Sequence, residues 1–129
     1  MSTRSVLASA ALIPLALGLG VPAPAHASHG GTAVRTGGSC SGSAHWRLKA
    51  KPDDGRIEVE GEIDSHGSGE VWHWTLRHNG SRSAAGRATT TGAGDSFEVP
   101  RRMTDLAGKD RFAFRATHGH QVCRGTVAL

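Results

Sequence analysis

The segment 71–78 alternates between apolar and polar residues along its length. Because successive side chains of a β-strand point to opposite faces, Trp72, Trp74 and Leu76 share one face. The other face takes the remaining residues, which are Val71, His73, Thr75 and Arg77. Asn79-Gly80 follows at once, and this dipeptide favours a two-residue hairpin turn. The pattern predicts a strand whose tryptophan side packs against a core, followed by a turn.

Two further alternating segments, 44–51 and 56–64, flank the turn residues 52–55 and predict a hairpin with a four-residue turn. The register expected from this turn pairs Lys51 with Arg56, Lys49 with Glu58, Leu48 with Val59, Arg47 with Glu60, His45 with Glu62 and Trp46 with Gly61. Basic residues then face acidic residues along the ladder. The row of carboxylates is therefore interpreted as a solvated, ion-paired face and not as acid–base machinery.

The segment 81–91 consists mainly of Ser, Arg, Ala and Thr and has little to bury, which is typical of an edge strand. A two-residue turn before it pairs Trp74 with Ala85 and Trp72 with Arg87. The second pair leaves two alternatives open. Either Arg87 covers the Trp72 ring in a cation–π contact at the rim of the core, or the ring is partly exposed.

Further along the chain, Phe97 and Val99 alternate up to Pro100, which has no N–H for a ladder and therefore marks an edge or a bulge. The segment 104–110 is expected to cross between two sheets, with Leu106 as its plug.

The last part of the chain predicts two more strands, 111–115 with Phe112 and Phe114 inward and 121–129 with Cys123 inward. The total is about seven strands with turn signals between them and no helical period. This pattern predicts an all-β fold, an antiparallel two-sheet sandwich of the immunoglobulin-like type.

The N-terminal region resembles a targeting signal more than a part of the fold. Arg4 precedes an apolar run over 6–21, and Ala25-His26-Ala27 is typical of a signal-peptidase site. Residues 1–27 are therefore predicted to be a signal peptide. No second long apolar run follows, so we expect secretion without membrane insertion.

The segment after the predicted cleavage site, 28–42, is rich in Gly, Ser and Thr and predicts a flexible lead-in. The sandwich domain is expected to occupy 43–129.

Charge and cysteine content narrow the function classes. The formal net charge is only +4, and the arginines are spread from Arg35 to Arg124 along the sequence, so nucleic-acid binding is not expected. The chain has two cysteines, Cys40 and Cys123, and an oxidising compartment favours a disulfide between them. That disulfide closes a long loop and compensates for the small core of a domain of this size.

Five stretches stand out together: 40–49 (CSGSAHWRLK), 53–60 (DDGRIEVE), 72–74 (WHW), 78–80 (HNG) and 123–127 (CRGTV). In this combination they resemble small secreted proteins of actinobacteria. The resemblance spans nearly the whole chain after the predicted signal peptide. It implies secretion and an immunoglobulin-like sandwich with one disulfide, and it implies no particular activity.

Histidine is abundant, with eight residues in the chain. In an immunoglobulin-like sandwich the loop of His66 and the loop of His118 and His120 lie at the same end. Three imidazoles there would suit Zn²⁺ or Cu²⁺. The alternatives are solvated loop histidines and pH sensing.

The sequence offers one other candidate site. Trp72 with Arg87 is a candidate binding surface, in which the ring would stack on a sugar, against the alternative that the tryptophans are core residues. For nucleophilic catalysis the sequence offers no strand-to-helix elbow carrying a Ser or Cys, so no enzyme is expected.

The sequence thus predicts a secreted, non-enzymatic, monomeric binding or structural module of the extracellular space or cell envelope, without a required cofactor. Its partner is an unidentified extracellular protein or cell-wall polymer. Two alternatives remain: a protease inhibitor that presents the loop 91–96, and a Zn- or Cu-binding protein that uses His66, His118 and His120.

Overall fold

A computed structural model describes residues 31–92 and 94–129, so the predicted signal peptide, 1–27, lies outside the described residues. The described part contains eight β-strands and no helix. Their bounds are β1 Val34–Ser39, β2 His45–Asp53, β3 Arg56–Asp64, β4 Val71–His78, β5 Ser81–Thr89, β6 Ser96–Thr104, β7 Arg111–His118 and β8 Gln121–Ala128. None of these residues belongs to a helix long and apolar enough to cross a membrane.

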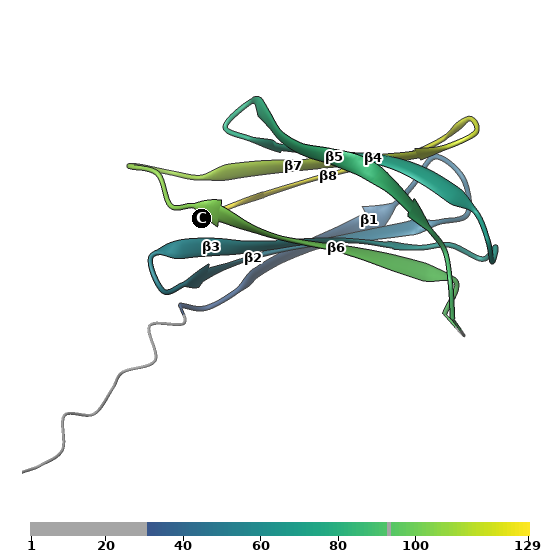
Figure 1. The fold of residues 1–129 in the computed structure, drawn as a ribbon, viewed down its shortest axis with the longest axis horizontal. Helices are drawn as coiled ribbons and strands as arrows, with labels where there is room; N and C mark the ends of the chain where they lie inside the picture. The colour runs from purple at the N-terminus through teal and green to yellow at the C-terminus, as the bar shows by residue number, and fades with distance from the viewer. Residues whose placement is uncertain (1–30, 93) are drawn as a thin grey trace, which may run out of the picture.

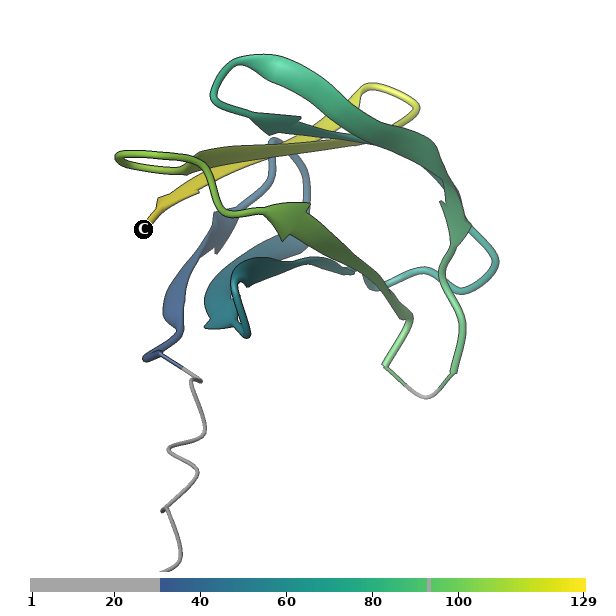
Figure 2. The same ribbon diagram turned by 60° about the vertical axis from the view of Figure 1, so that its left-hand side comes forward.

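The strands form two antiparallel sheets of four strands each, with the orders β1-β2-β3-β6 and β5-β4-β7-β8. Figure 1 shows the two sheets as layers, and Figure 2 shows the chain crossing between them at the ends of the strands. The prediction of an all-β, two-sheet antiparallel fold is confirmed, with eight strands where about seven were expected.

The additional strand is β1, which lies within the segment predicted to be a flexible lead-in. Val34–Ser39 pairs with β2 from Val34 opposite Ala50 to Ser39 opposite His45. The segment has almost no apolar side chain to bury, but an edge strand needs only backbone hydrogen bonds on one side, and glycine and serine supply these as well as any residue. A sequence pattern based on side chains therefore missed it.

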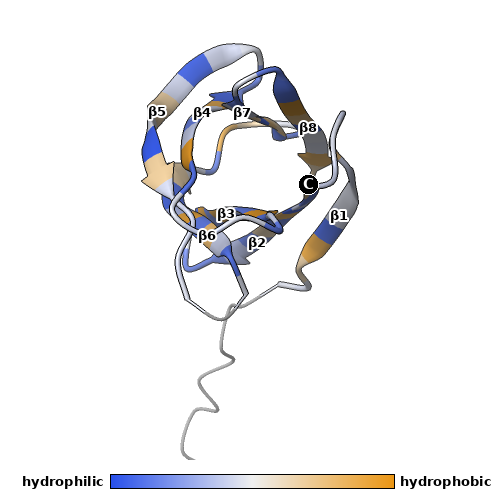
Figure 3. Ribbon diagram, turned by 90° about the vertical axis from the view of Figure 1, so that its right-hand side faces the viewer, coloured by the Kyte–Doolittle hydropathy of each residue, from blue (hydrophilic) through white to orange (hydrophobic). Residues whose placement is uncertain are grey.

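The core lies between the two sheets and takes the alternate residues of their strands. Trp72, Trp74 and Leu76 are all buried, which confirms the predicted inner face of the tryptophan strand. In Figure 3, orange and blue bands alternate along the strands that surround the core. The other large buried side chains come from both sheets: Leu48, Ile57, Val59, Ile63, Phe97, Val99, Met103, Phe112, Phe114 and Val127.

The first hairpin forms as predicted, but its register is shifted by two residues. Asp54 and Gly55 both have positive φ, at 53° and 78°, and form a two-residue turn that pairs Asp53 with Arg56. The expected four-residue turn was therefore wrong. A shift of two residues leaves every side chain on its own face, so basic residues still oppose acidic ones. The observed pairs are Lys51 with Glu58, Lys49 with Glu60, Arg47 with Glu62, Leu48 with Gly61 and Trp46 with Ile63.

The tryptophan hairpin turns at Asn79-Gly80 as predicted, and the register then shifts between Leu76 and Arg77. Ser83 is the extra residue of this β-bulge, because Arg77 pairs with Arg82 and Leu76 with Ala84. Two predicted pairs were therefore wrong, since Trp74 lies opposite Gly86, Trp72 opposite Ala88 and His73 opposite Arg87.

This bulge has a simple physical reason. Without it Arg87 would point into the core, whereas with it the small residues Ala84, Gly86 and Ala88 do so. A Cβ built on Gly86 would lie only 2.9 Å from the Trp74 ring, so the glycine makes room for the indole. Arg87 is thereby turned outward and is exposed.

Pro100 lies on an edge strand as predicted, because β6 pairs with β3 alone. Leu106 was expected to plug the crossing between sheets, but it is 44% exposed. The buried residue of that segment is Asp110, which bonds to the His78 ring through Oδ1 and accepts a 3.4 Å hydrogen bond from the Leu106 N–H. Hydrogen bonds that Asp110 makes with His78 and with the Leu106 backbone therefore hold this crossing where an apolar plug was expected.

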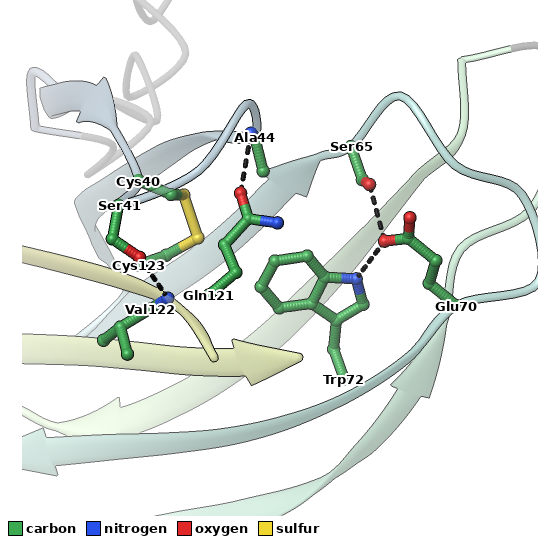
Figure 4. The surroundings of a disulfide bond; sticks show 9 residues. All are labelled: Cys40, Ser41, Ala44, Ser65, Glu70, Trp72, Gln121, Val122 and Cys123. Carbon is green, nitrogen blue, oxygen red and sulfur yellow. Dashed lines mark hydrogen bonds between the residues drawn. A yellow bond between two sulfur atoms is a disulfide. The ribbon is translucent and has the colours of Figure 1, made fainter. Parts of the chain in front are cut away.

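Cys40 and Cys123 form the predicted disulfide, which joins the end of β1 to β8 (Figure 4). Two hydrogen bonds reinforce this junction, because the Ser41 N–H donates to the Val122 carbonyl and the Val122 N–H donates to Ser41 Oγ, both at 2.8 Å. The Gln121 side chain accepts the Ala44 N–H at 2.8 Å.

Trp46, which is half-buried, packs on Gly125 of β8, and not opposite Gly61 as expected. A Cβ on Gly125 would overlap the six-membered ring of Trp46, and the space beside Gly61 is occupied by Phe114.

We expect Gly125→Ala to lower the free energy of unfolding by about 1–3 kcal/mol, because a methyl group must displace the ring. Urea unfolding measures this, with the exposed neighbour Thr126→Ala as the control. Equal stability of the two variants would contradict this packing.

Candidate functional site

The three histidines predicted to bind metal do not come together. The His118 ring lies against Trp72 at 5.4 Å between centroids, with the two planes tilted by 31°, and its Nδ1–H donates to the Val71 carbonyl at 2.8 Å. The His66 ring meets that of His45 edge-on at 6.4 Å. His120 lies exposed at the turn between β7 and β8. Within 31–92 and 94–129, no three His, Cys, Asp or Glu side chains are grouped so as to hold a metal ion.

Trp72 is a core residue in this structure, fully buried, with its indole held by Glu70 (Figure 4). The Trp72 Nε1–H donates to Glu70 Oε2 at 3.2 Å, and Ser65 Oγ–H donates to the same oxygen at 2.7 Å. Arg87 is not beside it. The cation–π contact of the core is instead made by Arg101 of β6, whose guanidinium carbon lies 4.8 Å from the Trp74 ring centroid.

The polar groups around Glu70 hydrogen-bond to one another and to the backbone of the loop 65–70. Thr90 is buried, and its hydroxyl links two backbone groups, since Oγ1 accepts the Glu70 N–H at 3.0 Å and donates to the Gly67 carbonyl at 2.6 Å. The His118 Nε2 lies 3.9 Å from the Glu70 carboxylate. Ser65 Oγ is thus bonded to a carboxylate and not to an imidazole, so these residues do not form the relay of a nucleophilic serine.

The loop 91–96, considered for protease inhibition, includes residue 93, which lies outside the described residues. Thr91 and Ser96 at its ends form an isolated β-bridge.

The outer face of the sheet β5-β4-β7-β8 is unusual because its charged side chains are all positive. Its strands carry six exposed arginines and no Asp or Glu: Arg77, Arg82, Arg87, Arg111, Arg115 and Arg124. We call this surface the arginine face. The aromatic and Cys residues of β4, β7 and β8 point to the core, and the alternate positions, where these arginines stand, therefore point outward.

Two pairs of these arginines stand directly opposite each other on neighbouring strands. Arg77 of β4 pairs with Arg82 of β5, and Arg115 of β7 pairs with Arg124 of β8. Directly opposed residues have Cβ atoms about 5 Å apart, and side chains of like charge at directly opposed positions destabilise a sheet. Arg77 opposes Ala113, two residues from Arg115, so the two pairs are diagonal neighbours. The four form an arginine row that crosses all four strands.

The opposite sheet is built differently, since its charges are balanced. Lys49 lies 3.3 Å from Glu58 and 3.5 Å from Glu60, and Arg102 lies 3.1 Å from Asp53. The hydrogen bond from Arg47 to Glu62, at 2.7 Å, raises the pKa of the Arg47 guanidinium, with the charge of Glu62 adding to the effect. By contrast, no ion pair among the described residues includes an arginine of the arginine face.

An open groove of about 830 Å³ runs over the middle of the arginine face. Arg77, Arg115 and Arg124 line it together with the hydroxyl side chains Thr75 and Thr126. Small residues, Ala113 and Gly125, lie among them and leave the groove open. Its border is formed by β1, where Thr36 Oγ1–H donates to the Thr126 carbonyl at 2.9 Å.

The sequence interpretation missed this face because it treated the arginines as scattered. They are scattered along the chain, but antiparallel pairing brings alternate positions of four strands to one surface. One signal was available: every acidic residue falls within 53–70 or 95–110, so the four strands of this sheet contain none.

Comparison of the chain with protein-family models, with curated proteins and with solved structures finds no match in any of the three.

Proposed function

We propose that this protein is a secreted, non-enzymatic binding module that holds an anionic polymer of the cell envelope on its arginine face. The proposal rests on the arginine row. In it, two pairs of arginines stand directly opposite each other on neighbouring strands, and the strands of this face contain no carboxylate. A fold that accepts such repulsion gains nothing from it in the free state. A negatively charged partner would turn the same arrangement into an attraction.

The proposal includes an immunoglobulin-like fold and an extracellular location. The order β2-β3-β6 against β5-β4-β7-β8 corresponds to strands A-B-E against C′-C-F-G of such sandwiches, with β1 added before the first strand. The disulfide and the signal-like segment 1–27 support secretion. Both cysteines are in the disulfide and Ser65 is bonded to Glu70, which supports binding over nucleophilic catalysis.

An anionic envelope polymer without bases fits this surface better than a nucleic acid. Proteins that hold single-stranded nucleic acid combine positive charge with aromatic side chains on which bases stack. Among the described strands of this sheet, the Trp and Phe residues are all buried in the core. The exposed side chains of these four strands therefore offer charge and hydrogen-bond donors but no fully exposed Trp or Phe ring, and the half-buried Trp46 of β2, which also lines the groove, is packed on Gly125.

The test is co-sedimentation of the secreted protein with envelope fragments at increasing salt concentration. We expect binding that weakens steadily with salt, because each neutralised arginine releases counterions from the polymer. Arg115→Gln with Arg124→Gln should lower the affinity about tenfold or more. The matched control is Arg35→Gln with Arg56→Gln, which removes the same charge from the other sheet and should leave binding within about twofold.

The fold provides an internal check on this experiment. Because Arg115 and Arg124 repel each other across the ladder, their replacement should not lower the melting temperature. Equal loss of binding in the two double variants, or binding that does not respond to salt, would contradict the arginine face as the contact surface.

A further inference from the structure

We propose that the groove between Arg77, Arg115 and Arg124 is a subsite for phosphate groups, so that the polymer on the arginine face is a phosphorylated one. This inference rests on the proposed function and names the chemical class of its ligand.

The charged wall of the groove, formed by Arg77, Arg115 and Arg124, presents side-chain groups that are hydrogen-bond donors and not acceptors. Each guanidinium carries five N–H donors and no acceptor, and the hydroxyls of Thr75 and Thr126 add two rotatable donors. Arg77 uses one N–H to reach the Gly80 carbonyl at 3.0 Å, which anchors its side chain at the turn end of β4. A ligand that satisfies this wall must be rich in acceptors and carry concentrated negative charge.

The spacing of the arginines favours phosphate over carboxylate. Arg115 and Arg124 oppose each other, with Cβ atoms about 5 Å apart, so one anionic group can lie between both guanidinium planes. A carboxylate has only two oxygens, both in one plane, and a single bidentate arginine fork already engages both of them. A phosphate group presents oxygens in tetrahedral directions, so it can accept from both arginines and from a threonine hydroxyl at once.

The repeated pairing points to a polymer and not to a single ion. Arg82 and Arg77 form a second opposed pair one diagonal step from the first, a step of about 7–8 Å. The arginine row therefore spans roughly 17 Å across the sheet. A chain with successive phosphate groups that crosses the strands meets both pairs.

The experiment is calorimetric titration of the secreted protein with long-chain inorganic polyphosphate and with polyglutamate carrying the same number of charges. We expect polyphosphate to bind at least tenfold more tightly. Arg115→Gln with Arg124→Gln should remove most of that preference, whereas Arg35→Gln with Arg56→Gln should keep it. A variant that keeps the charge, Arg115→Lys with Arg124→Lys, should bind both polymers but lose the preference, because an ammonium group lacks the planar fork.

The outcomes separate this inference from the function on which it rests. Equal affinity for polyphosphate and polyglutamate, with envelope binding still dependent on Arg115 and Arg124, would overturn the phosphate subsite and leave the binding module intact. Tighter binding of a sulfated polymer such as heparin than of polyphosphate would overturn it in the same way. Absence of binding to every polyanion and to the envelope would overturn both.

Discussion

Replacing Trp72 by Ala is expected to lower the free energy of unfolding by about 3–5 kcal/mol. The indole is fully buried and packs against two rings, those of Phe97 at 6.2 Å and His118 at 5.4 Å between centroids. Truncation leaves a cavity and also removes the Nε1–H donor from Glu70. A domain of this size has only about 5–15 kcal/mol in total, so the variant should be largely destabilised and partly unfolded at elevated temperature.

Urea unfolding followed by circular dichroism measures this, and two further variants divide the effect. Trp72→Phe keeps most of the apolar contact and loses the hydrogen bond, so we expect a cost of about 1–2 kcal/mol. Val71→Ala changes the neighbouring residue on the outer face, which is 44% exposed, and should cost less than about 0.5 kcal/mol. A Trp72→Ala variant as stable as Val71→Ala would show that the ring is not in the core.

Removing the disulfide is the second change with a large expected effect. Cys40 and Cys123 are 83 residues apart in sequence, so the bond closes most of the folded chain into one loop. The chain-entropy model gives about 4–5 kcal/mol for such a loop, and measured losses for native disulfides of small domains are about 2–5 kcal/mol. We expect Cys40→Ala with Cys123→Ala to fall within this range.

Reduction of the unaltered protein under the same conditions is the control, because it breaks the same bond without changing a side chain's packing volume. The two should agree, since the hydrogen bonds between Ser41 and Val122 remain in both. A double variant that unfolds at the same urea concentration as the oxidised protein would mean that β1 and β8 are held without the disulfide.

The candidate site shows most clearly where prediction from the sequence ends. The outward position of Arg77 followed directly from the alternation of its strand. That Arg115 stands diagonally across from it depends on the pairing of β4 with β7, two strands separated by β5 and β6 along the chain. No local pattern encodes that pairing, because it is chosen by the packing of the whole core.

The register of the two hairpins is the second feature that could not be predicted from the sequence. The first hairpin alternates equally well in two registers that differ by two residues, and the choice was made by positive φ at Asp54 and Gly55. In the second hairpin a bulge at Ser83 turned Arg87 outward, so the expected pairing of Arg87 with Trp72 was not formed. The bulge places small residues of β5 opposite the two indoles of β4, which need the space.

By itself the sequence determined the strands with strong alternation, the inner face of the tryptophan strand, the disulfide and the two-sheet antiparallel class. These follow from local chemistry, namely side-chain alternation, turn residues and the number of cysteines. Only the tertiary structure decided the strand β1, the two registers and the gathering of six arginines on one acid-free surface. These depend on which distant strands become neighbours, and that is settled by burial of the shared core over the whole chain.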